Sequence, residues 1–151
     1  MEEHGLEQIH SIESSLIRCL RIAKKAQYWK QVQTLSSLKL DRPAASILML
    51  LSKKPQKFQE LVDKLGIEAP SVSRKVHELE DSGLIIRKNS NDKRVHLLST
   101  SPEGDLEAKK IYKAQCALLS EVISSWSISE REQFVVLFDK FATGLEHRFI
   151  K

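Results

Sequence analysis

Residues 58–88 read FQELVDKLGIEAPSVSRKVHELEDSGLIIRK, and this stretch decides the fold. Its first eight residues place apolar side chains three and four positions apart, which predicts a short helix. Gly66 follows, where a tight turn needs a conformation that glycine adopts easily. A second helix is predicted over 70–82, and two helices joined by a short turn that contains glycine form a helix-turn-helix. The expected buried face of the second helix consists of Val72, Val76 and Leu79.

The opposite face of the helix 70–82 is polar and basic when residues are projected at ~100° per step. Arginine bonds guanine through two hydrogen bonds and serine reaches phosphate or base, so this face suits a major groove. An ordinary amphipathic surface helix has the same pattern, and that alternative stays open at this point. The outward residues are Pro70, Ser71, Ser73, Arg74 and His77, and Lys75 lies nearer the buried boundary.

The segment after this pair of helices predicts a β-hairpin. Gly83 ends the second helix, and apolar runs at 84–88 and 95–98 flank the polar, turn-prone hexapeptide 89–94. A helix-turn-helix followed by a hairpin is a winged helix. A basic hairpin tip suits the minor groove, although a solvated surface hairpin is the alternative. The tip and its approaches hold Arg87, Lys88, Lys93 and Arg94 against Asp92 alone.

Long segments without glycine or proline flank this centre. The segment 6–42 contains neither residue, and its apolar stripe predicts one long helix. Ser101 and Pro102 predict the start of a helix that runs to about Trp126. The stretch 129–132 matches a capping box and opens a last helix that is rich in phenylalanine. We expect these apolar faces to interlock with a second copy of the chain, and an intramolecular bundle is the alternative.

Length and composition limit the classes of protein. The 151 residues, 41% hydrophobic and 29% charged with a net charge of +4, fit one ordinary globular domain. No apolar run is long enough to span a bilayer and no signal-peptide pattern is present, so we expect a cytoplasmic protein. The predicted division is 1–40 for an N-terminal dimerisation helix, 41–100 for the DNA-binding region and 101–151 for C-terminal dimerisation helices.

No catalytic, cofactor or metal motif is present. Phosphate-binding glycine loops, nucleophile elbows and paired His or Cys ligands are all missing from the sequence, which argues against an enzyme and against a metal site. Cys19 and Cys116 lie far apart, and we expect both to be buried thiols in a reducing compartment.

The central residues resemble the MarR (multiple antibiotic resistance regulator) family. The matching run is Glu60-Leu61, Leu65-Gly66, Ser71 to Arg74, Leu79-Glu80, Gly83-Leu84, Asp92 to Arg94 and Gly104. The resemblance implies a mainly α fold with a small β-hairpin wing, in which a winged helix-turn-helix is flanked by dimerisation helices. Lys57, Glu68 and Pro70 depart from the Ser or Thr that is usual in the family at these positions.

Family members are dimeric regulators that bind pseudo-palindromic double-stranded DNA, and many respond to small ligands or oxidants. The resemblance therefore implies that helix 70–82 enters the major groove, that Arg94 enters the minor groove, and that Asp92 holds Arg94 in place. A winged-helix adaptor that binds only proteins is the alternative, and it predicts a neutral or acidic wing. The predicted DNA contacts are Pro70, Ser71, Ser73, Arg74, Lys75, His77, Lys88, Asp92, Lys93 and Arg94.

The segment 18–30 contains five basic residues and no acid, with two aromatic residues between them. Such a lining suits a small aromatic or otherwise anionic effector, and a solvated basic face is the alternative. Some members of the family sense peroxide through a thiol in the first helix, so the resemblance makes Cys19 the candidate for an oxidant-sensing thiol. Arg18 and Arg21 would favour its thiolate, whereas a buried cysteine would be inert. The candidate effector-binding residues are Arg18, Arg21, Lys25, Tyr28 and Trp29.

Overall fold

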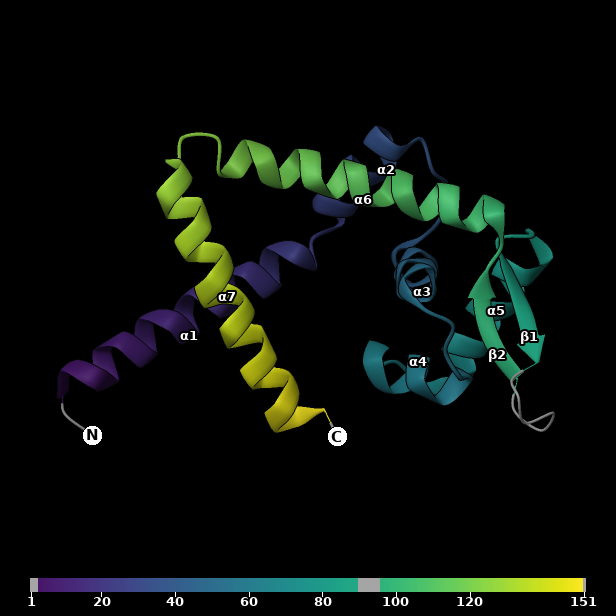
Figure 1. Ribbon diagram of the computed structural model, residues 1–151, viewed down its shortest axis with the longest axis horizontal. Coiled ribbons are helices and arrows are strands. Elements are labelled where there is room, and N and C mark those ends of the chain that lie inside the picture. Colours follow the sequence, from purple (N-terminus) through teal and green to yellow (C-terminus); the bar gives the residue numbers. More distant parts are fainter. Residues whose placement is uncertain (1–2, 90–95, 151) are drawn as a thin grey trace.

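The computed structural model describes residues 3–89 and 96–150, and this part of the chain is mainly helical with one small hairpin (Figure 1). The helices and strands follow in the order α1 (Glu3–Ala23), α2 (Ala26–Ser36), α3 (Arg42–Lys53), α4 (Phe58–Leu65), α5 (Ala69–Asp81), β1 (Ile85–Asn89), β2 (His96–Thr100), α6 (Pro102–Val122) and α7 (Ile128–Phe149). No helix within the described ranges is long and apolar enough to cross a bilayer.

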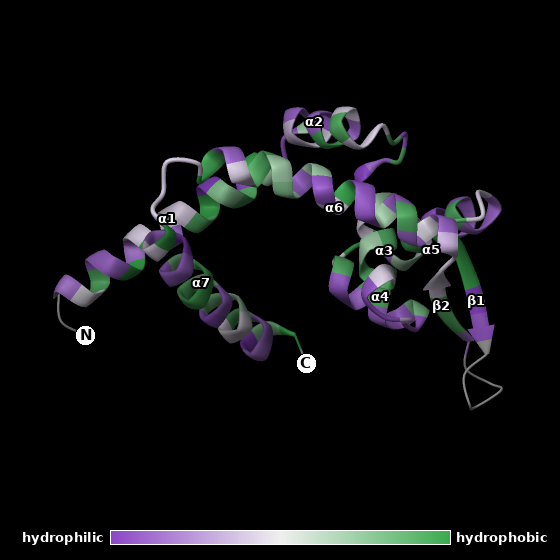
Figure 2. Ribbon diagram, turned by 45° about the horizontal axis from the view of Figure 1, so that its top comes forward, coloured by the Kyte–Doolittle hydropathy of each residue, from purple (hydrophilic) through white to green (hydrophobic). Residues whose placement is uncertain are grey.

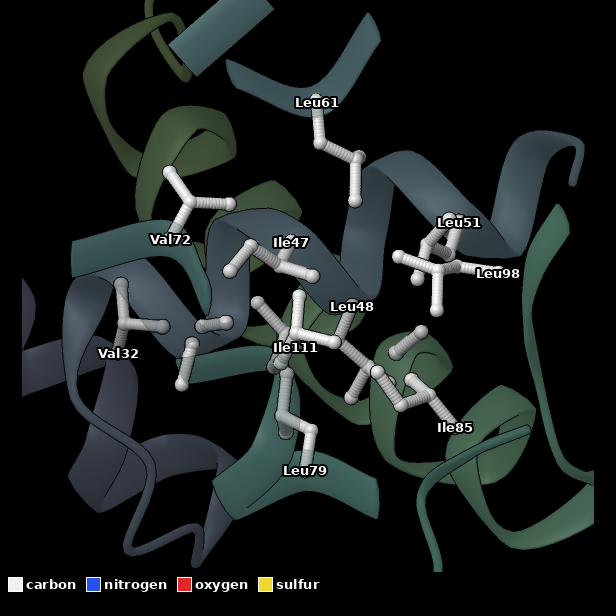
Figure 3. Packing of buried hydrophobic residues seen from close by; sticks show 14 of the residues in the cluster. Val32, Ile47, Leu48, Leu51, Leu61, Val72, Leu79, Ile85, Leu98 and Ile111 are labelled. Atoms are coloured by element: carbon white, nitrogen blue, oxygen red, sulfur yellow. The ribbon is translucent and has the colours of Figure 1, made fainter. Parts of the chain in front are cut away.

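The core lies where α3, α4 and α5 meet the hairpin and the first half of α6 (Figure 3). The three residues predicted for the inner face of α5 are each 1% exposed, so the predicted orientation of that helix is confirmed. Gly66 adopts φ 60° at the end of α4, as the predicted turn requires. The central buried side chains are Val32, Ile47, Leu48, Leu51, Leu61, Val72, Val76, Leu79, Ile85, Leu98 and Ile111.

The hairpin pairs β1 with β2 antiparallel, with Ile85 opposite Thr100 and Asn89 opposite His96. On its other edge, β2 exchanges two backbone hydrogen bonds with Gln56, through Leu98, at 3.0 and 2.8 Å. Gln56 is 1% exposed, and its amide donates to the Leu50 carbonyl and accepts from the Lys64 ammonium. The base of the hairpin is thus joined to the end of α3 and to α4.

The N-terminal segment is not one long helix, and that prediction is wrong. α1 ends at Ala23, and Lys25 adopts an extended conformation (φ −67°, ψ 136°) before α2 begins. No glycine or proline is needed, because any residue adopts these angles. The break is decided by tertiary packing, since it allows α2 to bury Val32 and Ser36 where it packs on α6.

The C-terminal helices begin at serine caps. Ser101 accepts a hydrogen bond from Gly104, as the predicted start of α6 requires. The last helix starts two residues earlier than predicted, because Ser127 and Glu130 form the capping box instead of the pair at 129 and 132. The backbone N–H and hydroxyl of Ser127 donate to the Glu130 carboxylate at 2.7 and 2.8 Å, and these hydrogen bonds lower the pKa of Glu130.

α1 and α7 project from the core (Figure 2), and many of their large apolar residues are exposed. α7 contains no buried residue at all. Cys19 and Cys116 are also exposed, so the prediction that both are buried is wrong, because each lies on a helix face that the described part of the chain leaves uncovered. The large exposed apolar residues of these helices are Leu6, Ile9, Ile12, Ile17, Leu20 and Ile22 on α1, and Ile128, Phe134, Val135, Val136, Leu137, Phe138, Leu145 and Phe149 on α7.

Candidate nucleic-acid interface

α5 presents a polar face on the side away from the core. Pro70, Arg74 and His77 are exposed there, and Ser71 and Ser73 are half-buried beside them. Pro70 occupies the first turn, where its missing N–H leaves no helical hydrogen bond unmade. Five of the predicted contact residues are therefore brought together on one helical face.

Arg74 is the cation on this face that is available to a ligand. Its guanidinium forms no ion pair with any residue in the described ranges. His77 has a more defined arrangement, because its Nδ1 lies 2.7 Å from the Ser73 carbonyl oxygen. A carbonyl only accepts, so Nδ1 carries the proton and Nε2 is left for an external partner.

Lys75 points away from this face. Its ammonium lies 2.6 Å from the Asp41 carboxylate and 2.7 Å from that of Glu78, and its side chain is 16% exposed. The pKa of Lys75 is raised mainly by its hydrogen bond to Asp41 and, to a smaller extent, by its hydrogen bond to Glu78. Asp41 also caps α3 by accepting from the Ala44 N–H at 3.0 Å. Lys75 therefore ties the candidate recognition helix to the start of α3.

Arg87, one of the basic residues near the predicted wing tip, likewise forms an ion pair with a carboxylate. Its guanidinium donates to both oxygens of Glu80, at 2.5 and 3.1 Å, and Glu80 raises its pKa. Lys88 is exposed on β1. Asp92, Lys93 and Arg94 lie outside the described residues.

A second group of exposed cations was missed by the sequence analysis. Lys53, Lys54 and Lys57 are exposed around the short segment that pairs with β2 through Gln56. The sequence run 53–57, with three lysines in five residues next to the helix-turn-helix, is the signal that identifies them. Neither Lys57 nor Glu68 caps its helix through its side chain, in line with their departure from the family pattern.

The candidate effector residues do not form one lining. Arg18, Arg21 and Lys25 are exposed on α1 and at its end, whereas Tyr28 and Trp29 are half-buried and pack against the core. The indole Nε1 of Trp29 is buried and has no hydrogen-bond partner among the described residues. Cys19 is exposed on the same helix as Arg18 and Arg21.

Comparison with known proteins finds a family that matches part of the chain. The profile of the MarR family matches residues 38–95. An uncharacterized HTH-type transcriptional regulator of Bacillus subtilis, YwoH, is 28% identical over 87 residues, which cover 58% of this chain and 64% of that relative.

Two solved structures share the fold over almost the whole chain. The transcriptional regulator BldR from Sulfolobus solfataricus superposes with a TM-score of 0.72 at 19% identity, covering 95% of this chain and 99% of BldR. A MarR family protein from Bacillus stearothermophilus gives 0.69 at 18% identity and covers 100% and 99%. The predicted mainly helical fold with a small hairpin wing is confirmed. Residues 38–95 thus match the MarR family of regulators, and the chain shares the fold of a solved member of that family.

Proposed function

We propose that the chain acts as a homodimer that binds a pseudo-palindromic DNA operator, with α5 of each copy in a major groove and each wing in the adjacent minor groove. The observation that carries the proposal is the outward face of α5, where Arg74 lies between half-buried serines and the oriented ring of His77 and forms no ion pair within residues 3–89 and 96–150. Arginine and short hydroxyls are the side chains that read base edges and phosphates.

The dimeric part of the proposal is supported by the exposed apolar faces of α1 and α7. A single chain leaves these faces in water, and a contiguous apolar surface of this kind is typical of a protein interface. A second copy is the partner that accounts for both helices, because a two-fold axis places the same surfaces of two chains against each other.

Selection of bound duplexes from a random DNA pool by the full-length protein tests the proposal. A palindromic consensus is the expected result. The affinity for the selected duplex should also fall steeply with salt, roughly a thousandfold between 50 and 200 mM if about six phosphates are neutralised. A nearly flat salt dependence and no enriched sequence would instead favour a winged-helix adaptor that binds proteins.

The exposed Cys19 and the buried Trp29 Nε1, which has no hydrogen-bond partner among the described residues, favour control of this binding by an oxidant or by an anionic aromatic effector. The same titration, repeated with benzoate and then with hydrogen peroxide, separates the two. Release by benzoate that is lost in Trp29→Phe supports the effector, because this change removes the indole N–H donor and leaves a smaller aromatic ring. Release by peroxide that is lost in Cys19→Ser supports the thiol. No release by either reagent would argue against both.

A further inference from the structure

The last turn of α5 is joined to the first strand of the wing by one side-chain pair. Arg87 Nε lies 2.5 Å from Glu80 Oε1, and Arg87 Nη2 lies 3.1 Å from Glu80 Oε2. Parallel bonds from a guanidinium to both oxygens of a carboxylate fix distance and orientation together. The side chain of Glu80 is only 21% exposed, whereas that of Arg87 is 50% exposed.

The pair lies where the hairpin leaves the core. Ile85 is 2% exposed, and Arg87, two residues further along β1, lies on the same face of the strand. Beyond this point the two strands have each other as partners, and an isolated two-stranded ribbon is marginally stable in water. A fixed contact between β1 and α5 therefore influences how the described strands of the hairpin are oriented relative to α5.

Resting on the DNA-binding function proposed above, we infer that the Glu80–Arg87 pair is a positioning device, which sets the wing relative to the recognition helix so that both reach their grooves together. Neither residue is assigned a DNA contact. Glu80 has the wrong charge for a DNA contact. The Nε and Nη2 groups of Arg87 already donate to the Glu80 carboxylate. Misplacement of the wing would weaken specific binding, which needs both parts in register, more than non-specific binding.

A purely electrostatic role makes the opposite prediction for Glu80. Glu80→Gln removes a negative charge near DNA and frees Arg87 for phosphate, so charge alone would strengthen binding to any duplex. If the pair positions the wing, Glu80→Gln weakens binding to the selected duplex while leaving the affinity for an unrelated duplex unchanged or higher. The sign of the Glu80→Gln effect therefore separates positioning from charge.

The experiment measures affinities of the full-length protein for two duplexes, one selected by the wild type from a random pool and one of scrambled sequence. We expect Glu80→Gln to lower the ratio of the two affinities by about threefold or more, within the range of a partly exposed ion pair. Arg87→Lys keeps the charge but loses the two-pronged geometry, and it should lower the ratio in the same way. The matched control is Glu107→Gln on α6, which breaks a similar pair with Lys110 at a similarly covered carboxylate and should leave the ratio unchanged.

An unchanged or higher ratio in Glu80→Gln, with helicity retained, overturns the inference. If Glu80→Gln does not fold, Arg87→Lys decides alone, since it conserves the net charge. A wild-type protein that selects no duplex overturns the proposed function and this inference with it, whereas a selected duplex with an unchanged ratio overturns this inference only.

Discussion

At the scale of single residues, Arg74 and Lys75 are neighbours with opposite environments. Arg74 is exposed and unpaired in the described part of the chain, whereas Lys75 is held by two carboxylates. A helix turns about 100° per residue, so adjacent basic residues need not serve the same partner. Arg74 thus remains the principal candidate for base recognition, and Lys75 has a structural role.

Replacing Arg74 by Ala should weaken binding to the selected duplex by about tenfold to a hundredfold and relax the preference at one base pair. Arg94→Ala, a change suggested by the sequence of the wing, should weaken binding to the same duplex by roughly tenfold or more. Titrations of the selected duplex measure both, with Lys109→Ala on the exposed side of α6 as the control. Unchanged affinity in Arg74→Ala, with native helicity, would remove α5 as the reading element.

Gly104 marks the closest approach between α6 and the turn that ends α5. A Cβ atom there would lie 1.9 Å from the Leu84 carbonyl oxygen, and the same turn receives hydrogen bonds from the N–H and hydroxyl of Ser101. Gly104→Ala should therefore destabilise the protein by about 3 kcal/mol, since the backbone must move. Thermal unfolding measures this loss. Lys109→Ala, on the exposed side of α6, is the control and should leave the melting temperature close to that of the wild type. Equal melting temperatures in the two variants would contradict the account of this joint.

At the scale of elements, the helix-turn-helix is the part that local sequence specifies. Gly66 and the inner face of α5 depend on neighbours within a few positions, so pattern and turn chemistry suffice to place them. The break at Lys25 does not follow from a local signal, because no breaking residue stands there. At the start of α7, the pairs 127/130 and 129/132 both match the capping pattern, so the sequence alone does not select between them. The partners of Lys75 and Arg87 were also not predictable, since each pairing depends on how two elements meet in space.

The contact of Lys75 with Asp41 gives an element-scale prediction. Lys75→Met should lower stability by about 1–2 kcal/mol, because two carboxylates lose their shared partner. The salt dependence of DNA affinity should not change, since Lys75 neutralises no phosphate. Asp41→Asn is the matched test of the same tie, because Asn still caps α3 while the negative charge is lost. A shallower salt dependence in Lys75→Met would restore Lys75 as a DNA contact.

At the scale of the whole molecule, the residues that form the buried core and the residues that we expect to join two copies lie in different parts of the chain. The core holds α3 to α5, the hairpin and part of α6, whereas α7 contributes no buried residue. The aromatic rings of α7 contact mainly one another and the preceding turn: Phe134 stacks on Phe138 at 5.1 Å and meets Trp126 edge-on at 5.2 Å. Such a surface can change without loss of the winged-helix core, so assembly can be tested separately from folding.

Leu137→Glu makes that test, because Leu137 is 65% exposed and lies on α7 beside a groove lined by Phe141 and Leu145. We expect the wild type to sediment as a dimer and the variant as a monomer, since a charge would be buried in an apolar interface. The monomer reads one half-site, so the slope of log affinity against log salt should fall to about half. Lys109→Glu, a charge reversal on the exposed side of α6, is the control. It should sediment as a dimer and bind the palindromic duplex more nearly as the wild type does than Leu137→Glu. A wild-type monomer that binds DNA, or a Leu137→Glu dimer with an unchanged salt slope, would show that α7 is not the surface that joins two copies.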